Sequence, residues 1–83
     1  MAALFVAARP GGLAGARTAA GMSQRDLEGE AGVSRSTISV LERVPGYGIE
    51  VDKASAVAAA LGVHPGRLFM HKNGDPVAWE MTG

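Results

Sequence analysis

Signals that begin and end helices recur between residues 13 and 70, at intervals too short for any one helix to be long. Ser23 precedes Asp26 by three residues, which is the pattern of a capping box, and Ser34 is suited to cap a further helix. The glycines that can close helices in a left-handed conformation are Gly21, Gly32 and Gly62. The chain is therefore expected to fold from several short helices.

These signals predict helices over about residues 13–20, 24–31, 35–43 and 53–61, with Asp52 capping the fourth. His64 and Pro65 then occupy the N-cap and first position of a short fifth turn, "GRLFM". No segment between residues 13 and 70 alternates with period two. The fold class is accordingly predicted to be all-α, a compact five-helix bundle.

Short extensions flank this predicted domain: an N-terminal arm at residues 1–12 and a C-terminal tail at residues 71–83. "LFVAA" in the arm is compatible with an extended arm, a strand or a helical turn. An Asn-Gly turn signal in the tail favours a small hairpin, although Pro76 weakens it.

Several function classes are excluded by what the sequence lacks. It has no cysteine, so disulfides and thiolate metal sites are ruled out, and His64 and His71 have no further ligands nearby. The most apolar run, residues 2–8, is too short to span a bilayer, so a cytoplasmic protein is expected. No phosphate-binding loop follows a strand, and no nucleophile has a neighbouring histidine and acid. We therefore expect no enzyme, no cofactor, no metal and no membrane association.

The formal net charge is zero, so binding to nucleic acid would depend on where the charges lie. Five arginines precede Gly48, whereas acids slightly outnumber bases from Ile49 onward. The basic side chains are thus concentrated in the part of the chain that contains the first three predicted helices.

The second and third predicted helices are joined by about three residues containing Gly32, which is the spacing of a helix-turn-helix. The apolar positions of that motif are Leu27, Ala31, Val33, Ile38 and Leu41. Together with "ARTAAGMSQ" before it and "VAAALGVHPGRLF" after it, the motif resembles the phage repressor and Cro (XRE) family. The resemblance covers roughly residues 13–69 and implies a DNA-binding protein whose recognition helix is residues 35–43.

Helical periodicity turns Ile38 and Leu41 inward and leaves a face of short and basic side chains outward. The residues expected to read base edges in the major groove are Arg35, Ser36, Ser39 and Val40. Those expected to contact the DNA backbone are Ser23, Gln24, Ser34, Thr37, Arg43 and Tyr47. The alternative for any single hydroxyl is that it belongs to a solvated, serine-rich surface and contacts nothing.

Two further positions follow from the resemblance. The family places an arginine of its first helix against a glutamate of the recognition helix, which implies an Arg17–Glu42 ion pair; two unrelated surface charges are the alternative. The family usually has alanine where this chain has Glu28, so that carboxylate must point sideways or find a partner.

The function implied is a sequence-specific transcriptional regulator, a small phage or prophage repressor or Cro-like protein that binds a palindromic operator as a homodimer. The alternative is an antitoxin or adaptor, in which the tail binds a protein partner. The apolar side chains outside the predicted helices, which would cover each other or form the dimer contact, are Leu4, Phe5, Val6, Val77, Trp79 and Met81.

Overall fold

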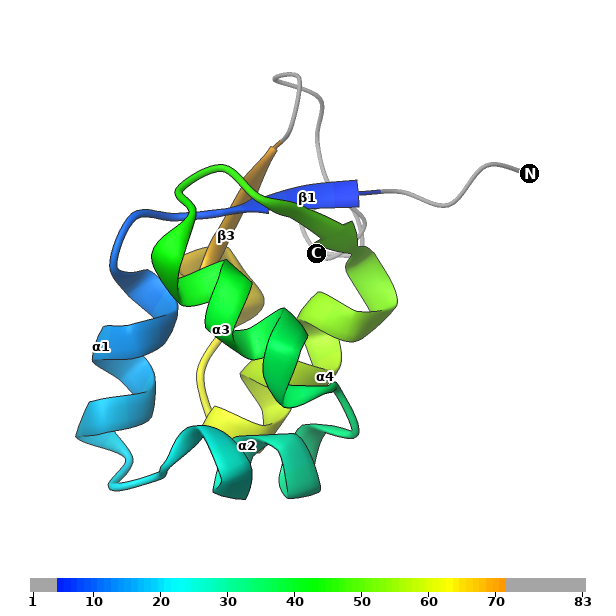
Figure 1. Ribbon diagram of the computed structural model, residues 1–83. Coiled ribbons are helices and arrows are strands. Elements are labelled where there is room, and N and C mark those ends of the chain that lie inside the picture. The colour runs from blue at the N-terminus through cyan, green and yellow to red at the C-terminus, as the bar shows by residue number, and fades with distance from the viewer. Residues whose placement is uncertain (1–4, 72–83) are drawn as a thin grey trace.

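Four helices and a small antiparallel sheet make up the part of the chain that the structure, a computed structural model, describes, residues 5–71. The helices are α1 (Gly12–Ala19), α2 (Gln24–Ala31), α3 (Arg35–Arg43) and α4 (Val51–Leu61). The strands are β1 (Phe5–Ala8), β2 (Gly48–Glu50) and β3 (Phe69–His71), and a 3₁₀ turn, η1, spans Pro65–Arg67. The strands lie across one end of the helices (Figure 1).

Capping positions the helices as the sequence predicts. Ser23 and Asp26 form a complete capping box at the start of α2, and the Ser34 side chain accepts a hydrogen bond from the Thr37 N–H at the start of α3. Gly32 closes α2 with φ of 70°, a conformation in which a residue with a side chain would be strained. The α2–turn–α3 unit thus has the predicted boundaries.

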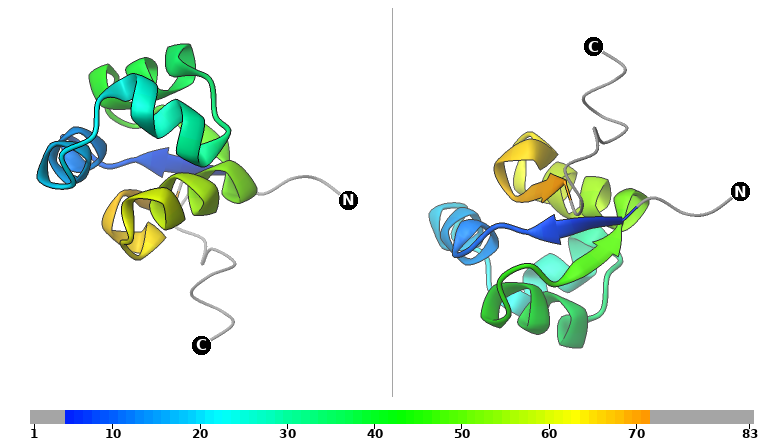
Figure 2. Two further views of the ribbon diagram at one scale, coloured as in Figure 1. Left: turned by 90° about the horizontal axis from the view of Figure 1, so that it is seen from below. Right: turned by 90° about the horizontal axis from the view of Figure 1, so that it is seen from above.

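The prediction of an all-α, five-helix fold is only partly right, because three short strands form a sheet in the order β2-β1-β3. Val6 of β1 pairs with Ile49 on one side and with His71 on the other. Figure 2, in the view from above, shows β1 between its two neighbours. Strands of three and four residues are too short to display a period-two pattern.

Two helix boundaries also differ from the prediction. Helix α4 begins at Val51 with Glu50 as N-cap, so Asp52 lies in its first turn instead of capping it. The expected fifth helical turn is the 3₁₀ turn η1, whose His64 cap is confirmed: the Nδ1 atom accepts a hydrogen bond from the Gly66 N–H. Phe69 then enters β3, where its side chain is buried.

The core joins the sheet to all four helices. The largest side chains that are fully buried are Phe69, Leu13, Leu27, Ile38, Leu68, Val6 and Val57. Burying side chains of this size supplies most of the folding free energy of so small a domain, about 1.5–3 kcal/mol each. Leu27 of α2 and Ile38 of α3, on either side of the turn, are both fully buried, so the outer face of α3 is held in a fixed position.

Candidate nucleic-acid interface

An open hollow of about 360 Å³ lies on the outer face of α3. It is lined by Gln24, Arg35, Ser36, Ser39, Val40 and Arg43. All four residues predicted to read bases line this hollow, together with two of those predicted to contact the backbone. The side chains near its centre are short, so the helix backbone can approach a partner closely.

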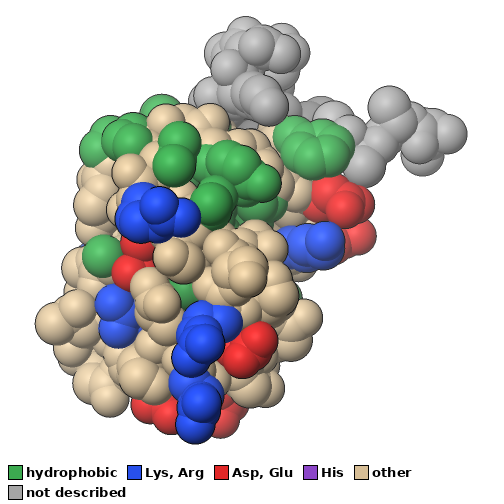
Figure 3. Space-filling model, viewed as in Figure 1, with side chains coloured by type: hydrophobic (Ala, Val, Ile, Leu, Met, Phe, Trp, Pro, Cys, Tyr) green, Lys and Arg blue, Asp and Glu red, His purple; other side chains and the backbone are tan. Residues whose placement is uncertain are grey.

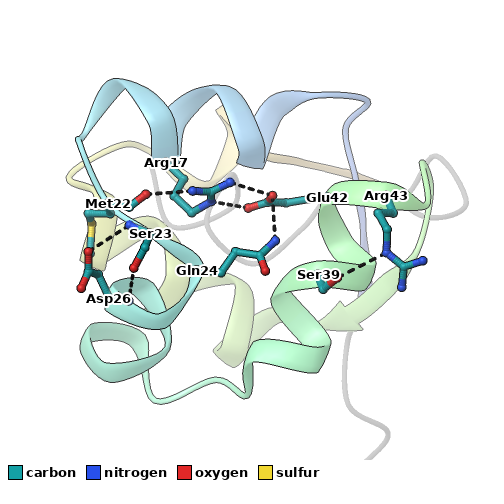
Figure 4. A network of polar contacts seen from close by, with 8 residues as sticks. All are labelled: Arg17, Met22, Ser23, Gln24, Asp26, Ser39, Glu42 and Arg43. Carbon is teal, nitrogen blue, oxygen red and sulfur yellow. Dashed lines mark hydrogen bonds and ion pairs between the residues drawn. The ribbon is translucent and has the colours of Figure 1, made fainter.

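Arg43 is held over this face by its own helix. Its Nε donates to the Ser39 hydroxyl at 3.3 Å, one helical turn earlier, as Figure 4 shows. The terminal guanidinium nitrogens extend beyond that contact, and the side chain is exposed. Arg43 therefore presents a positive charge at the C-terminal end of the hollow.

A polar network beside the hollow ties α1, α2 and α3 together (Figure 4). Arg17 donates from Nε and Nη2 to the two carboxylate oxygens of Glu42, at 2.6 and 3.1 Å, and from Nη1 to the Met22 carbonyl. Gln24 donates from Nε2 to the same carboxylate at 3.1 Å. The Arg17–Glu42 ion pair that the resemblance implies is thus present, and Gln24, expected at the DNA backbone, also has a structural contact.

This network fixes the charge of Glu42. The hydrogen bond from Arg17 lowers the pKa of the Glu42 carboxyl, against the opposing effect of burial, and the Gln24 amide lowers the pKa further. The Glu42 side chain is 9% exposed and that of Arg17 is 19% exposed, so the pair is mostly shielded from water. It anchors the C-terminal half of α3 from the inner side.

The hydroxyls at the two N-caps are already engaged. Ser34 Oγ accepts from the Thr37 N–H and donates to Thr37 Oγ1, while Ser23 Oγ accepts from the Asp26 N–H. The Asp26 carboxylate in turn accepts from the Ser23 N–H, which lowers the pKa of that carboxyl. A phosphate at the start of α2 would therefore meet the negative charge of the Asp26 carboxylate.

Thr37 and Tyr47 lie together at a different hollow, of about 140 Å³, which Lys53 and Glu50 also line. They are therefore separated from the hollow that contains Arg35. Tyr47 and nearby Val44 are 42% and 43% exposed. Figure 3 shows hydrophobic side chains gathered over the upper part of this face and basic ones spread over its middle and lower parts.

The Glu28 carboxylate, which the sequence expected either to point sideways or to find a partner, does have a partner. Its Oε2 accepts a hydrogen bond of 3.0 Å from the backbone N–H of Arg35, the first residue of α3. Sequence reasoning also missed the Gln24–Glu42 contact. Only the spacing of Gln24, at the start of α2, from Glu42, near the end of α3, could have suggested that these two polar side chains meet.

Within residues 5–71, no group of three histidine, aspartate or glutamate side chains is placed to hold a metal ion. None of the helices there is long and apolar enough to cross a membrane. What this region does offer is a capped helix with its apolar side buried, and with arginine, serine and glutamine side chains around an open hollow. These features define a helix-turn-helix domain of the DNA-binding kind.

Comparison with known proteins supports this classification. A family model described as Helix-turn-helix matches residues 13–68. The chain belongs to this family, the helix-turn-helix proteins of repressor/Cro (XRE) type, whose members bind DNA. Comparisons with curated proteins and with solved structures found no match.

Proposed function

We propose that this protein is a sequence-specific transcriptional regulator that places α3 in the major groove of DNA. The observation that carries the proposal is the hollow on α3, where the four residues expected to read bases lie beside Gln24 and Arg43. Arg35, at the N-terminal end of the helix, is suited to a bidentate contact with guanine O6 and N7. Ser36 and Ser39 would bond base edges, and Val40 would meet a thymine methyl group.

Backbone contacts are assigned to the side chains at the rim. Arg43 keeps its terminal nitrogens for a phosphate, and Gln24 lines the hollow while one of its N–H groups bonds Glu42. Ser23, Ser34 and Thr37 would have to share hydroxyls that already cap helices. Tyr47 would reach only DNA that extends toward the second hollow.

Because the net charge is zero, we expect binding to depend on specific contacts with DNA more than on a general electrostatic attraction to it. With 6 to 8 phosphate contacts per dimer, log affinity should fall with log salt at a slope of about −5 to −7. The measurement is a titration of one operator duplex at several salt concentrations.

Dimerisation completes the proposal, since one domain contacts too few base pairs to discriminate among sequences. Two copies would bind half-sites about 34–36 Å apart. We assign the contact between them to the C-terminal segment, residues 73–83, all of which lie outside the described residues. Removing this segment should leave a folded monomer with much weaker operator binding. If the truncated protein still dimerises, the exposed Val44 and Tyr47 become the place to look for the interface.

The test of the proposed function is selection of binding sites from random duplexes. A regulator of this kind, in a phage, a prophage or a bacterial genome, should enrich a palindromic or nearly palindromic sequence. If no sequence is enriched and a mobility-shift assay at stated salt shows no specific complex, the antitoxin or adaptor alternative is favoured. In that case the exposed apolar side chains at Val44 and Tyr47 would be the first candidates for a protein contact.

A further inference from the structure

The start of α3 is occupied by two protein acceptors. The Glu28 carboxylate, reaching over from α2, accepts from the Arg35 N–H at 3.0 Å, and Ser34 Oγ accepts from the Thr37 N–H at 3.2 Å. The Ser34 contact is an ordinary cap made by the adjacent residue. The Glu28 contact is different because it joins two helices and brings a full negative charge to the end of α3 that enters the groove.

A helix N-terminus normally attracts anions, because its N–H groups and the helix dipole both favour negative charge. On DNA, the anions that a protein meets are the backbone phosphates. With the Glu28 carboxylate already there, a phosphate that approaches the start of α3 meets repulsion. The Arg35 guanidinium, on the same residue whose N–H is held, then extends from a fixed point of the backbone.

We propose that Glu28 is a specificity-determining residue, which weakens binding to the DNA backbone and fixes the point from which Arg35 reaches a base. This inference rests on the proposed function. Its two parts are separable: the charge of the carboxylate disfavours phosphate at the start of α3, and its hydrogen bond positions the first turn. Glutamine at position 28 would remove the charge and keep an acceptor, whereas alanine would remove both.

The chain supplies a matched control in Glu30. It lies on the same helix two residues further on, and residues two apart on a helix do not face the same side. Its side chain is exposed, whereas that of Glu28 is half-buried. Glu30→Gln therefore makes the same change in net charge without altering the start of α3.

The experiment measures affinity for the selected operator and for a scrambled duplex of equal length, at several salt concentrations, for four proteins. These are the wild type and the variants Glu28→Gln, Glu28→Ala and Glu30→Gln. We expect Glu28→Gln to strengthen scrambled-DNA binding by about three- to tenfold, because the repulsion at each recognition helix is removed. Operator binding should strengthen less, because on the operator the base contact of Arg35, and not a phosphate at the start of α3, sets the position of the helix. Glu30→Gln should change both affinities by less than about twofold and to the same extent, as expected of a screened surface charge.

Glu28→Ala should show a further effect that separates positioning from charge. Without the hydrogen bond, preference at the base pair read by Arg35 should relax, whereas Glu28→Gln should keep that preference. The amide proton of Arg35, followed by NMR without DNA, should shift in Glu28→Ala far more than in Glu30→Gln. Circular dichroism checks that each variant is folded. If Glu28→Ala does not fold, Glu28→Gln still tests the effect of the charge.

The outcomes distinguish this inference from the proposed function. If the wild type enriches no sequence, the proposed function fails and the role of Glu28 in specificity fails with it. If the wild type enriches a sequence but Glu28→Gln leaves the operator-to-scrambled ratio unchanged, or Glu30→Gln lowers it equally, only the inference about Glu28 is overturned.

Discussion

The two faces of α3 differ sharply in burial and polarity within nine residues. On the inner face Ile38 is 0% exposed and Leu41 is 2% exposed, and Glu42 is bound by Arg17 and Gln24. On the outer face Arg35, Ser36 and Arg43 are exposed around an open hollow. The comparison indicates that stability and recognition can be changed separately by choosing the face, which the following predictions test.

The largest effect is expected on the inner face. Ile38→Ala removes a fully buried side chain and should lower the free energy of unfolding by about 3–4 kcal/mol, from lost transfer energy and the cavity left behind. Chemical denaturation measures it. Val40→Ala, two residues along on the outer face, should cost less than about 1 kcal/mol. Equal losses at the two positions would contradict the separation of faces.

The next largest effect is expected for Glu42→Ala. It should lower the free energy of unfolding by roughly 2–3 kcal/mol, between the values for exposed and fully buried ion pairs. The expected loss is smaller than that for a fully buried ion pair, because Arg17 keeps its hydrogen bond to the Met22 carbonyl and its side chain is 19% exposed. As a control, Lys53→Ala breaks the exposed Lys53–Glu50 pair and should cost under about 1 kcal/mol. A loss that small for Glu42→Ala would mean that the network does not anchor α3.

The same network predicts a pH dependence. Because Arg17 lowers the pKa of Glu42 in the folded state, the stabilisation is fully present above the ordinary glutamate pKa of about 4.3 and is lost as pH falls through the lowered value. The difference in unfolding free energy between wild type and Glu42→Gln should therefore be constant from neutral pH down to about 5 and shrink below about 4. A difference that grows on acidification would show the opposite sign of linkage.

On the outer face, Arg35→Ala should cost about 1–3 kcal/mol of binding per half-site and relax preference at one base pair, with stability unchanged within about 0.5 kcal/mol. Gln24→Ala should instead weaken all sequences alike and also lower stability by about 1 kcal/mol, since it loses the bond to Glu42. Binding selections and thermal unfolding measure the two effects. If Arg35→Ala weakens every sequence evenly, Arg35 contacts phosphate and not a base.

The smallest effect is expected where the two faces meet, at the N-cap of α3. Ser34→Ala should lower the free energy of unfolding by about 1 kcal/mol because the Thr37 N–H loses its acceptor. Ser36→Ala, in the first turn but not the cap, should change stability by less than about 0.5 kcal/mol. Urea denaturation of the two variants side by side makes the comparison; a Ser36 effect as large as that of Ser34 would contradict the cap.

Much of the helical part could be predicted because its signals are local. Ser23, Ser34 and His64 cap the elements that the sequence assigned to them, and Gly32 closes α2. A cap depends on residues two to four apart, so a single sequence contains all the information needed. The position of the outer face of α3 follows from the same local periodicity.

The sheet and the long-range polar contacts could not be predicted in the same way. β2 and β3 have three residues each, and whether they are strands depends on β1, which lies far from both in the sequence. The sequence left residues 4–8 open among arm, strand and helical turn for this reason. The bond from Arg35 N–H to Glu28 likewise depends on how two helices cross, which no local pattern specifies.

The central position of β1 has a consequence for the order of folding. Val6 is made early in synthesis, but its partner His71 follows only about 65 residues later, so the β1–β3 pairing waits for nearly the whole domain. The helices, with contacts close in sequence, can form in the meantime, whereas closing so long a loop adds an entropic cost to the last step. We therefore expect the sheet to close late, after α3 has packed against α1 and α2, which lie nearer to it in the sequence.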